Sequence, residues 1–211
     1  MNKNDKHLLL IDNYDSFSYN IVELLRSIDG IKVSIYKNDD PLILETIYDG
    51  VIVSPGPGLP SESGLLLDAL QKHITKVPLF GICLGLQAIV EFYGGKLKQL
   101  PTVFHGIRDK VTLLDEHSES PLFKNIPHRF FAGRYHSWVG AQKDLPSVLR
   151  LTALGSDGEI MAIENSNEHV YGVQFHPESF MTEHGLTMLQ NFINLLYKIE
   201  EKGLTHVPSL Q

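Results

Sequence analysis

Short apolar runs rich in β-branched residues alternate with segments of helical periodicity through the first half of the chain. Four runs have the length and composition of buried strands: Leu8–Asp12, Lys32–Tyr36, Gly50–Ser54 and Val77–Ile82. Apolar residues recur at helical spacing in Phe17–Ile28 and Ser63–Ile74, with Ser16 and either Ser61 or Ser63 as candidate N-caps. This alternation predicts βαβ units, in which helices flank a mainly parallel central sheet.

After Gly94 and Gly95 the pattern changes to short alternating runs, separated by turn signals such as Asp157-Gly158. The runs expected to form strands are Lys110–Leu114, Arg129–Phe131, Leu149–Ala153, Ile160–Glu164 and Val170–Phe175. They predict an additional antiparallel portion in an α/β fold. Gly185–Lys198 reads as an amphipathic helix, and residues from about 200 to 211 as a polar tail. Because no repeat or biased linker divides the chain, we expect a single domain over residues 1–211.

Composition narrows the classes of ligand. The chain has 211 residues, of which 43% are hydrophobic, enough to bury a substantial core. A formal net charge of −7 and the lack of a basic stripe argue against nucleic acid as a partner. The first apolar run, Leu8 to Ile11, is too short for a signal-peptide core or a membrane span. We therefore expect a cytoplasmic protein that does not interact with membranes.

The chain contains one cysteine, which lies where an apolar strand runs into an apolar helix. A buried structural thiol is the simplest interpretation of a lone cysteine. However, Gly81-Ile82-Cys83-Leu84-Gly85 matches a strand–turn–helix nucleophile elbow, in which flanking glycines let strand and helix approach closely. The helix N-terminus at this junction stabilises a thiolate and can hold an oxyanion. The pattern therefore favours a reactive Cys83.

A thiolate nucleophile needs a partner that passes protons to a leaving amine, and ten histidines are available. His176 differs from the others because it directly follows the apolar run Tyr171–Phe175 and precedes Pro177-Glu178. Proline biases His176 toward extended geometry, in which residues two apart face the same side. Glu178 could then orient the imidazole ring and stabilise its cation. A surface ion pair at a strand end is the alternative interpretation.

A rigid loop, Ser54-Pro55-Gly56-Pro57-Gly58, follows another predicted strand. Its prolines remove N–H donors and no lysine follows as in a phosphate-binding loop, so phosphate binding is not expected. We expect the N–H groups of Gly58 and Leu84 to hold a tetrahedral oxyanion, each donor contributing about 3 kcal/mol. A plain turn is the alternative here.

These three segments, which follow one another along the chain as 54–58, 81–85 and 172–178, together resemble the class-I, triad-type glutamine amidotransferases, and the likeness spans about Leu8 to Leu196. The segment Asp12 to Asn20 is similar to the small subunits of anthranilate synthase and aminodeoxychorismate synthase. Arg134-Tyr135-His136-Ser137-Trp138 and Thr182-Glu183-His184-Gly185 fit the same subgroup. Leu86 departs from it, since histidine is common there, which bears on the packing of the glutamine pocket.

The resemblance implies that Cys83 attacks the side-chain amide of glutamine, that His176 protonates the departing ammonia, and that Glu178 holds the histidine. It also implies a set of glutamine-binding residues: Gly56, Pro57, Gly58, Leu84, Gln87, Ser137 and Trp138. Helical spacing supports Gln87 independently, because positions i and i+4 share a helix face. An edge strand remains an open interpretation for Ser137 and Trp138. The histidines share no ligand spacing, so no metal is assigned.

A partner is also implied, namely a chorismate-binding synthase subunit that receives the ammonia. This chain would carry no cofactor, and magnesium would belong to the partner. The leading hypothesis is the glutaminase subunit of anthranilate synthase; the alternatives are the aminodeoxychorismate subunit or one that serves both. The competing classes are a Cys-His peptidase, a γ-glutamyl hydrolase and a catalytically silent subunit. Asp12 to Phe17 should lie at the carboxyl edge of the sheet and either face the synthase or form a helix cap built on Ser16.

Overall fold

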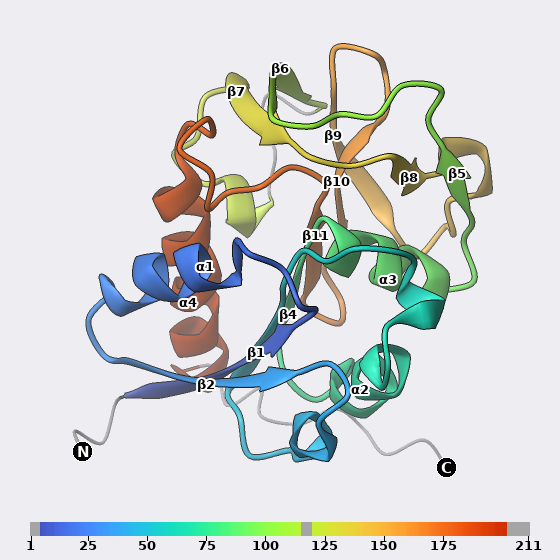
Figure 1. Ribbon diagram of the computed structural model, residues 1–211. Coiled ribbons are helices and arrows are strands. Elements are labelled where there is room, and N and C mark those ends of the chain that lie inside the picture. The colour runs from blue at the N-terminus through green and yellow to red at the C-terminus, as the bar shows by residue number, and fades with distance from the viewer. Residues whose placement is uncertain (1–4, 115–119, 202–211) are drawn as a thin grey trace.

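The structure is a computed structural model that describes residues 5–114 and 120–201 (Figure 1). One nine-stranded sheet runs through it in the order β2-β1-β3-β4-β11-β10-β9-β6-β7. The parallel strands are β1 (Lys6–Asp12), β2 (Ile31–Lys37), β3 (Gly50–Val53), β4 (Leu79–Ile82) and β11 (Val170–Val173). The antiparallel strands are β6 (Ile107–Leu113), β7 (Arg129–Arg134), β9 (Arg150–Leu154) and β10 (Ile160–Asn165). The predicted α/β fold with an antiparallel second half is confirmed.

Helices cover both faces of the parallel half (Figure 1). Strand β1 shows why, because its alternate side chains enter two separate cores. Leu8 and Leu10 pack with α1 (Ser18–Arg26) and α4 (Gly185–Glu201). Leu9 and Ile11 pack with α2 (Leu66–His73) and α3 (Leu84–Phe92) on the other face. Short 3-10 helices complete the chain: η1 (Pro41–Leu44), η2 (Pro60–Glu62), η3 (Pro121–Phe123) and η4 (Gln142–Asp144).

The predicted serine caps are wrong. Helix α1 begins after Phe17, whose N–H donates to the Asp15 carboxylate at 2.7 Å, rather than after Ser16. Helix α2 begins after Leu65. The hydroxyl of Ser63 donates instead to the carbonyl of Leu59 at 2.9 Å. In both places a loop tied to the sheet edge sets the start of the helix, and the nearest serine does not.

Two short strands form a separate small sheet that the alternation pattern did not predict. Strand β5 (Leu97–Gln99) pairs in antiparallel fashion with β8 (Trp138–Gly140). The edge-strand interpretation of Trp138 is therefore confirmed, since Trp138 begins β8. Helix α4 continues through the first two residues of the predicted polar tail, and residues 202–211 lie outside the described residues. Within the described ranges, every helix is too short or too polar to cross a membrane.

Candidate active site

The cysteine lies in the tight connection between β4 and α3, at the edge where the parallel strands end. Its φ of 54° and ψ of −101° place Cys83 in a strained backbone region for a residue with a side chain. A Cβ on Gly81 would lie 2.5 Å from the backbone of Gly85, and one on Gly85 would lie 2.7 Å from the Val53 carbonyl oxygen. Strand and helix thus touch where glycine alone fits, and the predicted elbow geometry is confirmed.

The imidazole of His176 and the carboxylate of Glu178 form a buried pair, with 2.7 Å between Nδ1 and Oε1. Their predicted contact is confirmed, but its predicted cause is wrong. Strand β11 ends at Val173, and His176 lies in a turn closed by the Ser179 N–H donating to the His176 carbonyl at 3.1 Å. The turn, rather than an extended segment, brings the two side chains together. The N–H of His176 also donates to the Gly133 carbonyl at 3.0 Å, which ties this turn to β7.

The thiol of Cys83 lies close enough to the imidazole of His176 to affect its pKa. Burial alone would lower the pKa of His176, but the neighbouring Cys83 sulfur and Glu178 carboxylate outweigh it and raise that pKa well above its ordinary value. The buried Nε2 of His176 makes no hydrogen bond to any residue that the structure describes. An uncommitted ring nitrogen beside a thiol is the arrangement that proton transfer to or from a substrate requires.

The proline- and glycine-rich loop lies against the elbow. A Cβ on Gly56 would lie 2.5 Å from the Asn13 Cβ and 2.7 Å from the Leu84 side chain. Asn13 fixes the loop, since its N–H donates to the Ser54 hydroxyl at 2.9 Å and its side-chain amide to the Ser54 carbonyl at 2.8 Å. Gly58 adopts a φ of +75°. The two candidate oxyanion donors, Gly58 and Leu84, therefore come from adjoining segments.

A glutamine that the sequence analysis did not single out contacts the sulfur. The side-chain amide of Gln174 donates to the Cys83 Sγ at 3.5 Å, and its oxygen accepts from Gln87 Nε2 at 3.3 Å. Gln87 Nε2 also donates to the Trp138 carbonyl at 2.8 Å. Gln174 is fully buried. In the sequence it is a polar residue in an otherwise apolar run, and this is the signal that could have identified it.

Aromatic side chains line the other side of the histidine. The Phe17 and Tyr135 rings lie 5.3 Å and 4.8 Å from the His176 ring, and 4.9 Å from each other. Asp12 holds the segment that carries Phe17, since its carboxylate accepts from the Ser18 hydroxyl at 2.8 Å and from Lys37 at 2.6 Å. The helix-cap alternative built on Ser16 is thus replaced by one built on Asp12 and Asp15.

Access to the sulfur is narrow, because Cys83 is 4% exposed. Leu86, where the resemblance departs, is fully buried and faces β11 at Gly172, in the core that α2 and α3 cover. Among the described residues, no group of three His, Cys, Asp or Glu side chains is arranged to hold a metal ion.

The fold and the site together are those of an α/β enzyme with a candidate cysteine nucleophile. A family model described as "Glutamine amidotransferase class-I" matches residues 9–195. The chain belongs to this family and is a glutamine-dependent enzyme subunit. The peptidase and γ-glutamyl hydrolase hypotheses are therefore set aside.

Relatives agree with this assignment, and a solved structure agrees with the fold. Anthranilate synthase component 2 of Lactococcus lactis subsp. lactis is 42% identical over 199 residues, which cover 93% of this chain and 98% of the relative. Aminodeoxychorismate/anthranilate synthase component 2 of Bacillus subtilis is 39% identical, covering 90% of this chain and 97% of the relative. A GMP synthase protein from Thermoplasma acidophilum has the same fold, with a TM-score of 0.83 at 23% identity, covering 94% of this chain and 98% of that one.

Proposed function

We propose that the chain is the glutamine-hydrolysing component of an anthranilate synthase and supplies ammonia to a chorismate-binding partner in tryptophan biosynthesis. The observation that carries the proposal is the buried His176–Glu178 pair beside an elbow thiol, in a chain that aligns with 98% of a relative named as component 2. The chemistry uses only protein groups of this chain, and magnesium would belong to the partner. A cytoplasmic location is part of the proposal, because a reactive thiol stays reduced there.

The elbow thiol acts as the nucleophile. The Cys83 sulfur, ionised next to the imidazolium of His176, attacks the side-chain amide carbon of glutamine and forms an Sγ–C bond. The N–H groups of Gly58 and Leu84 stabilise the oxyanion that forms, by about 3 kcal/mol each. His176 passes its proton to the leaving nitrogen as the C–N bond breaks, and ammonia departs. His176 then takes a proton from water, which hydrolyses the thioester to glutamate and restores the thiolate.

Glu178 keeps His176 in position throughout. Its hydrogen bond to Nδ1 directs Nε2 toward the reacting atoms, and its charge favours the imidazolium that forms in each step. Because both side chains are buried, this charge acts with little screening by water.

Glutamine binds between the loop Gly56–Gly58 and the backbone at Ser137 and Trp138, according to the same proposal. Both amide hydrogens of Gln87 are committed, one to the Trp138 carbonyl and one to Gln174, which leaves its side-chain oxygen for the substrate. Since Cys83 is almost fully buried, the site must open to admit glutamine, and partner binding provides a reason for it to open.

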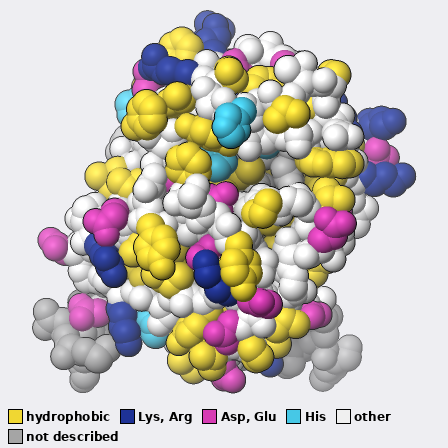
Figure 2. Space-filling model, in the orientation of Figure 1, with side chains coloured by type: hydrophobic (Ala, Val, Ile, Leu, Met, Phe, Trp, Pro, Cys, Tyr) yellow, Lys and Arg dark blue, Asp and Glu magenta, His cyan; other side chains and the backbone are white. Residues whose placement is uncertain are grey.

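The partner docks on the face around the site. Phe180, two residues beyond Glu178, is 90% exposed, and Tyr14 and Tyr19 of the first loop and helix are 56% and 65% exposed. Figure 2 shows hydrophobic side chains spread among charged ones on this view of the molecule. Exposed aromatic residues of this kind commonly fill pockets at protein interfaces. A synthase bound here would receive ammonia directly from the elbow.

The test is reconstitution with a purified chorismate-binding component, comparing glutamine and ammonium salts as nitrogen donors. Cys83→Ala should abolish glutamine-dependent anthranilate formation and leave ammonia-dependent formation intact, because the thiolate serves ammonia release alone. Equal loss of both activities would point to a structural cysteine. Glutamine use that survives the substitution would exclude Cys83 as the nucleophile, and a wild-type chain that uses no glutamine would be catalytically silent.

A second candidate is the equivalent subunit of aminodeoxychorismate synthase, or one that serves both enzymes. The Bacillus subtilis relative, whose name covers both functions at 39% identity, is the observation in its favour. Reconstitution with each of the two synthase components separates the candidates, because the product is anthranilate in one case and aminodeoxychorismate in the other.

A further inference from the structure

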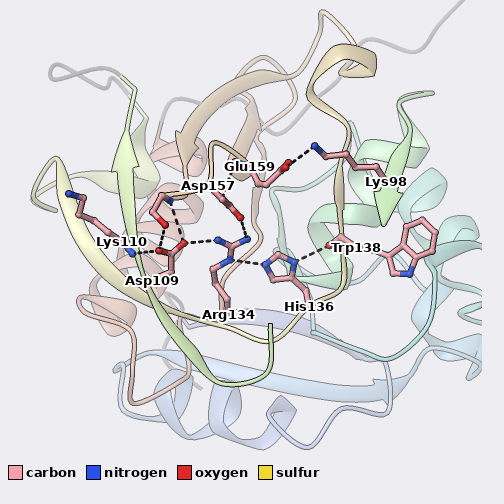
Figure 3. Close-up of polar contacts among 9 residues, drawn as sticks. Lys98, Asp109, Lys110, Arg134, His136, Trp138, Asp157 and Glu159 are labelled. Carbon is pink, nitrogen blue, oxygen red and sulfur yellow. Dashed lines mark hydrogen bonds and ion pairs between the residues drawn. The ribbon is translucent and has the colours of Figure 1, made fainter. Parts of the chain in front are cut away.

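Arg134, at the end of β7, is the largest completely buried side chain among the described residues, with an exposed fraction of 0%. Its guanidinium makes three directed contacts, which Figure 3 shows. Nη1 donates to Asp109 at 2.6 Å and Nη2 to Asp157 at 2.8 Å. Nε donates to Nε2 of His136 at 3.1 Å. Two acidic residues therefore fix the charged end, and the third contact faces the interior.

The contact with Arg134 decides which nitrogen of His136 carries the proton. A guanidinium only donates hydrogen bonds, so the Nε2 of His136 must accept and the proton must lie on Nδ1. That Nδ1–H donates to the Trp138 carbonyl at 3.1 Å. Burial and the Arg134 charge lower the pKa of His136 to about 3, which keeps the ring neutral near pH 7. The direction of both hydrogen bonds is thereby set.

The Trp138 carbonyl receives two hydrogen bonds, one from His136 Nδ1 and one from Gln87 Nε2. In Figure 3 the Trp138 indole points away from His136, so the network holds the backbone rather than the side chain. Phe104 covers the network, with its ring centroid 3.6 Å from the Arg134 guanidinium carbon and 5.5 Å from the His136 ring. A carbonyl with both lone pairs occupied by buried donors has little freedom to rotate.

We propose that Arg134 and His136 are positioning residues for glutamine: they fix the Trp138 carbonyl and, through it, the Ser137–Trp138 backbone and the Gln87 side chain. This inference rests on the proposed function, in which that backbone and Gln87 bind the substrate. It assigns the buried ion cluster a role in substrate binding beyond stabilising the fold. Asp109 and Asp157 support the network from the surface side.

Two substitutions of His136 test the proposal, because each keeps one of the two hydrogen-bonding functions of the imidazole and removes the other. His136→Asn keeps a donor near the Nδ1 position for the Trp138 carbonyl. His136→Gln keeps an acceptor near the Nε2 position for Arg134 but loses the donor to Trp138. Lys98→Ala is the control, since Lys98 pairs with Glu159 at 2.8 Å in the same region (Figure 3).

The measurement is the KM and kcat for glutamine in the full complex, with ammonia-dependent synthesis as the check that each variant folds and docks. We expect His136→Gln to raise the KM about tenfold, as for the loss of one hydrogen bond, with kcat nearly unchanged. His136→Asn and Lys98→Ala should stay close to wild type in KM. Should His136→Gln fail to fold, Asp157→Asn, which weakens the support of Arg134, should raise the KM by a smaller factor.

An unchanged KM in His136→Gln, or an equal rise in His136→Gln and His136→Asn, would overturn the proposal and leave Arg134 as a structural ion cluster. A fall in kcat alone would also overturn it. Failure of the proposed function looks different, because the wild-type complex itself would then use no glutamine.

Discussion

Replacing Gly81 by alanine tests how closely the elbow must pack to hold Cys83. The new Cβ would lie 2.5 Å from the carbonyl carbon and oxygen of Gly85 and 2.8 Å from the Ile89 side chain. Because ordinary contact begins at 3.4 Å, β4 and the start of α3 must move apart by about 0.9 Å. Cys83 lies on the connection between these two elements and would move with them.

The displacement gives the magnitude. Overpacking of this kind costs about 1–3 kcal/mol of folding free energy. A misplacement of roughly 1 Å at a reacting group costs on the order of 100-fold in rate, or about 2.7 kcal/mol of activation free energy. We therefore expect Gly81→Ala to lower kcat/KM for glutamine about 100-fold, and to leave ammonia-dependent synthesis by the complex near its wild-type value.

Gly94→Ala is the matched control. Apart from Gly94 itself and its two chain neighbours, no described residue has a heavy atom within 4 Å of a Cβ placed there, while the φ of +85° makes the substitution cost roughly 1–2 kcal/mol. The two variants should thus lose similar stability in urea unfolding, and Gly81→Ala alone should lose glutamine-dependent rate. Retention of that rate in Gly81→Ala, or equal loss in both variants, would refute the reasoning from elbow geometry.

Three further predictions follow from the contacts of Glu178, Gln174 and His136. Glu178→Gln should lower the glutamine-dependent kcat by roughly 100-fold or more, because it removes the charge that stabilises the imidazolium. The raised pKa of His176 stabilises the folded state at low pH, and this stabilisation is lost as the pH rises through that pKa. The free energy of unfolding, measured with urea, should therefore fall more between pH 7 and pH 9 in wild type than in Glu178→Gln; parallel curves would contradict this. Gln174→Met removes the donor to Sγ at similar volume, and should slow alkylation of Cys83 by iodoacetamide at neutral pH about tenfold; an unchanged rate would show that the contact does not support the thiolate. The pKa of His136 is lowered to about 3 in the folded state, so as the pH falls the unfolded chain takes up a proton on this residue before the folded chain does. Between pH 7 and pH 5 this difference should lower the free energy of unfolding by about 2 kcal/mol. His136→Asn should lose less over the same range, and an equal loss would rule out a neutral His136.

The elbow could be predicted from the sequence because its requirements are local. A strand must turn into a helix within a few residues, and glycine at positions 81 and 85 is the condition for their contact. The ends of neighbouring strands were less predictable. The predicted strands ran to Ser54 and Phe175, whereas β3 and β11 end at Val53 and Val173. Ser54 and Phe175 are nevertheless buried. A sequence pattern indicates which residues are buried, but not which of them form the hydrogen bonds between strands.

The supporting network could not be predicted because its partners lie far apart in the sequence. Arg134 lies 25 residues from Asp109 and 23 from Asp157, and Gln174 lies 91 from Cys83. Only the sheet order, in which β4 neighbours β11, brings the last pair together. A pattern along the chain identifies candidate polar residues, but their pairing depends on the tertiary fold.

The most direct test of the account is covalent labelling of the complex with a glutamine-like diazoketone, followed by mass spectrometry of the whole chain and of its peptides. A reactive elbow thiol in a glutamine pocket predicts one adduct per chain, located on Cys83, slowed by added glutamine and lost in Cys83→Ser. An unmodified wild-type chain, or an adduct on another residue that persists in Cys83→Ser, would contradict it.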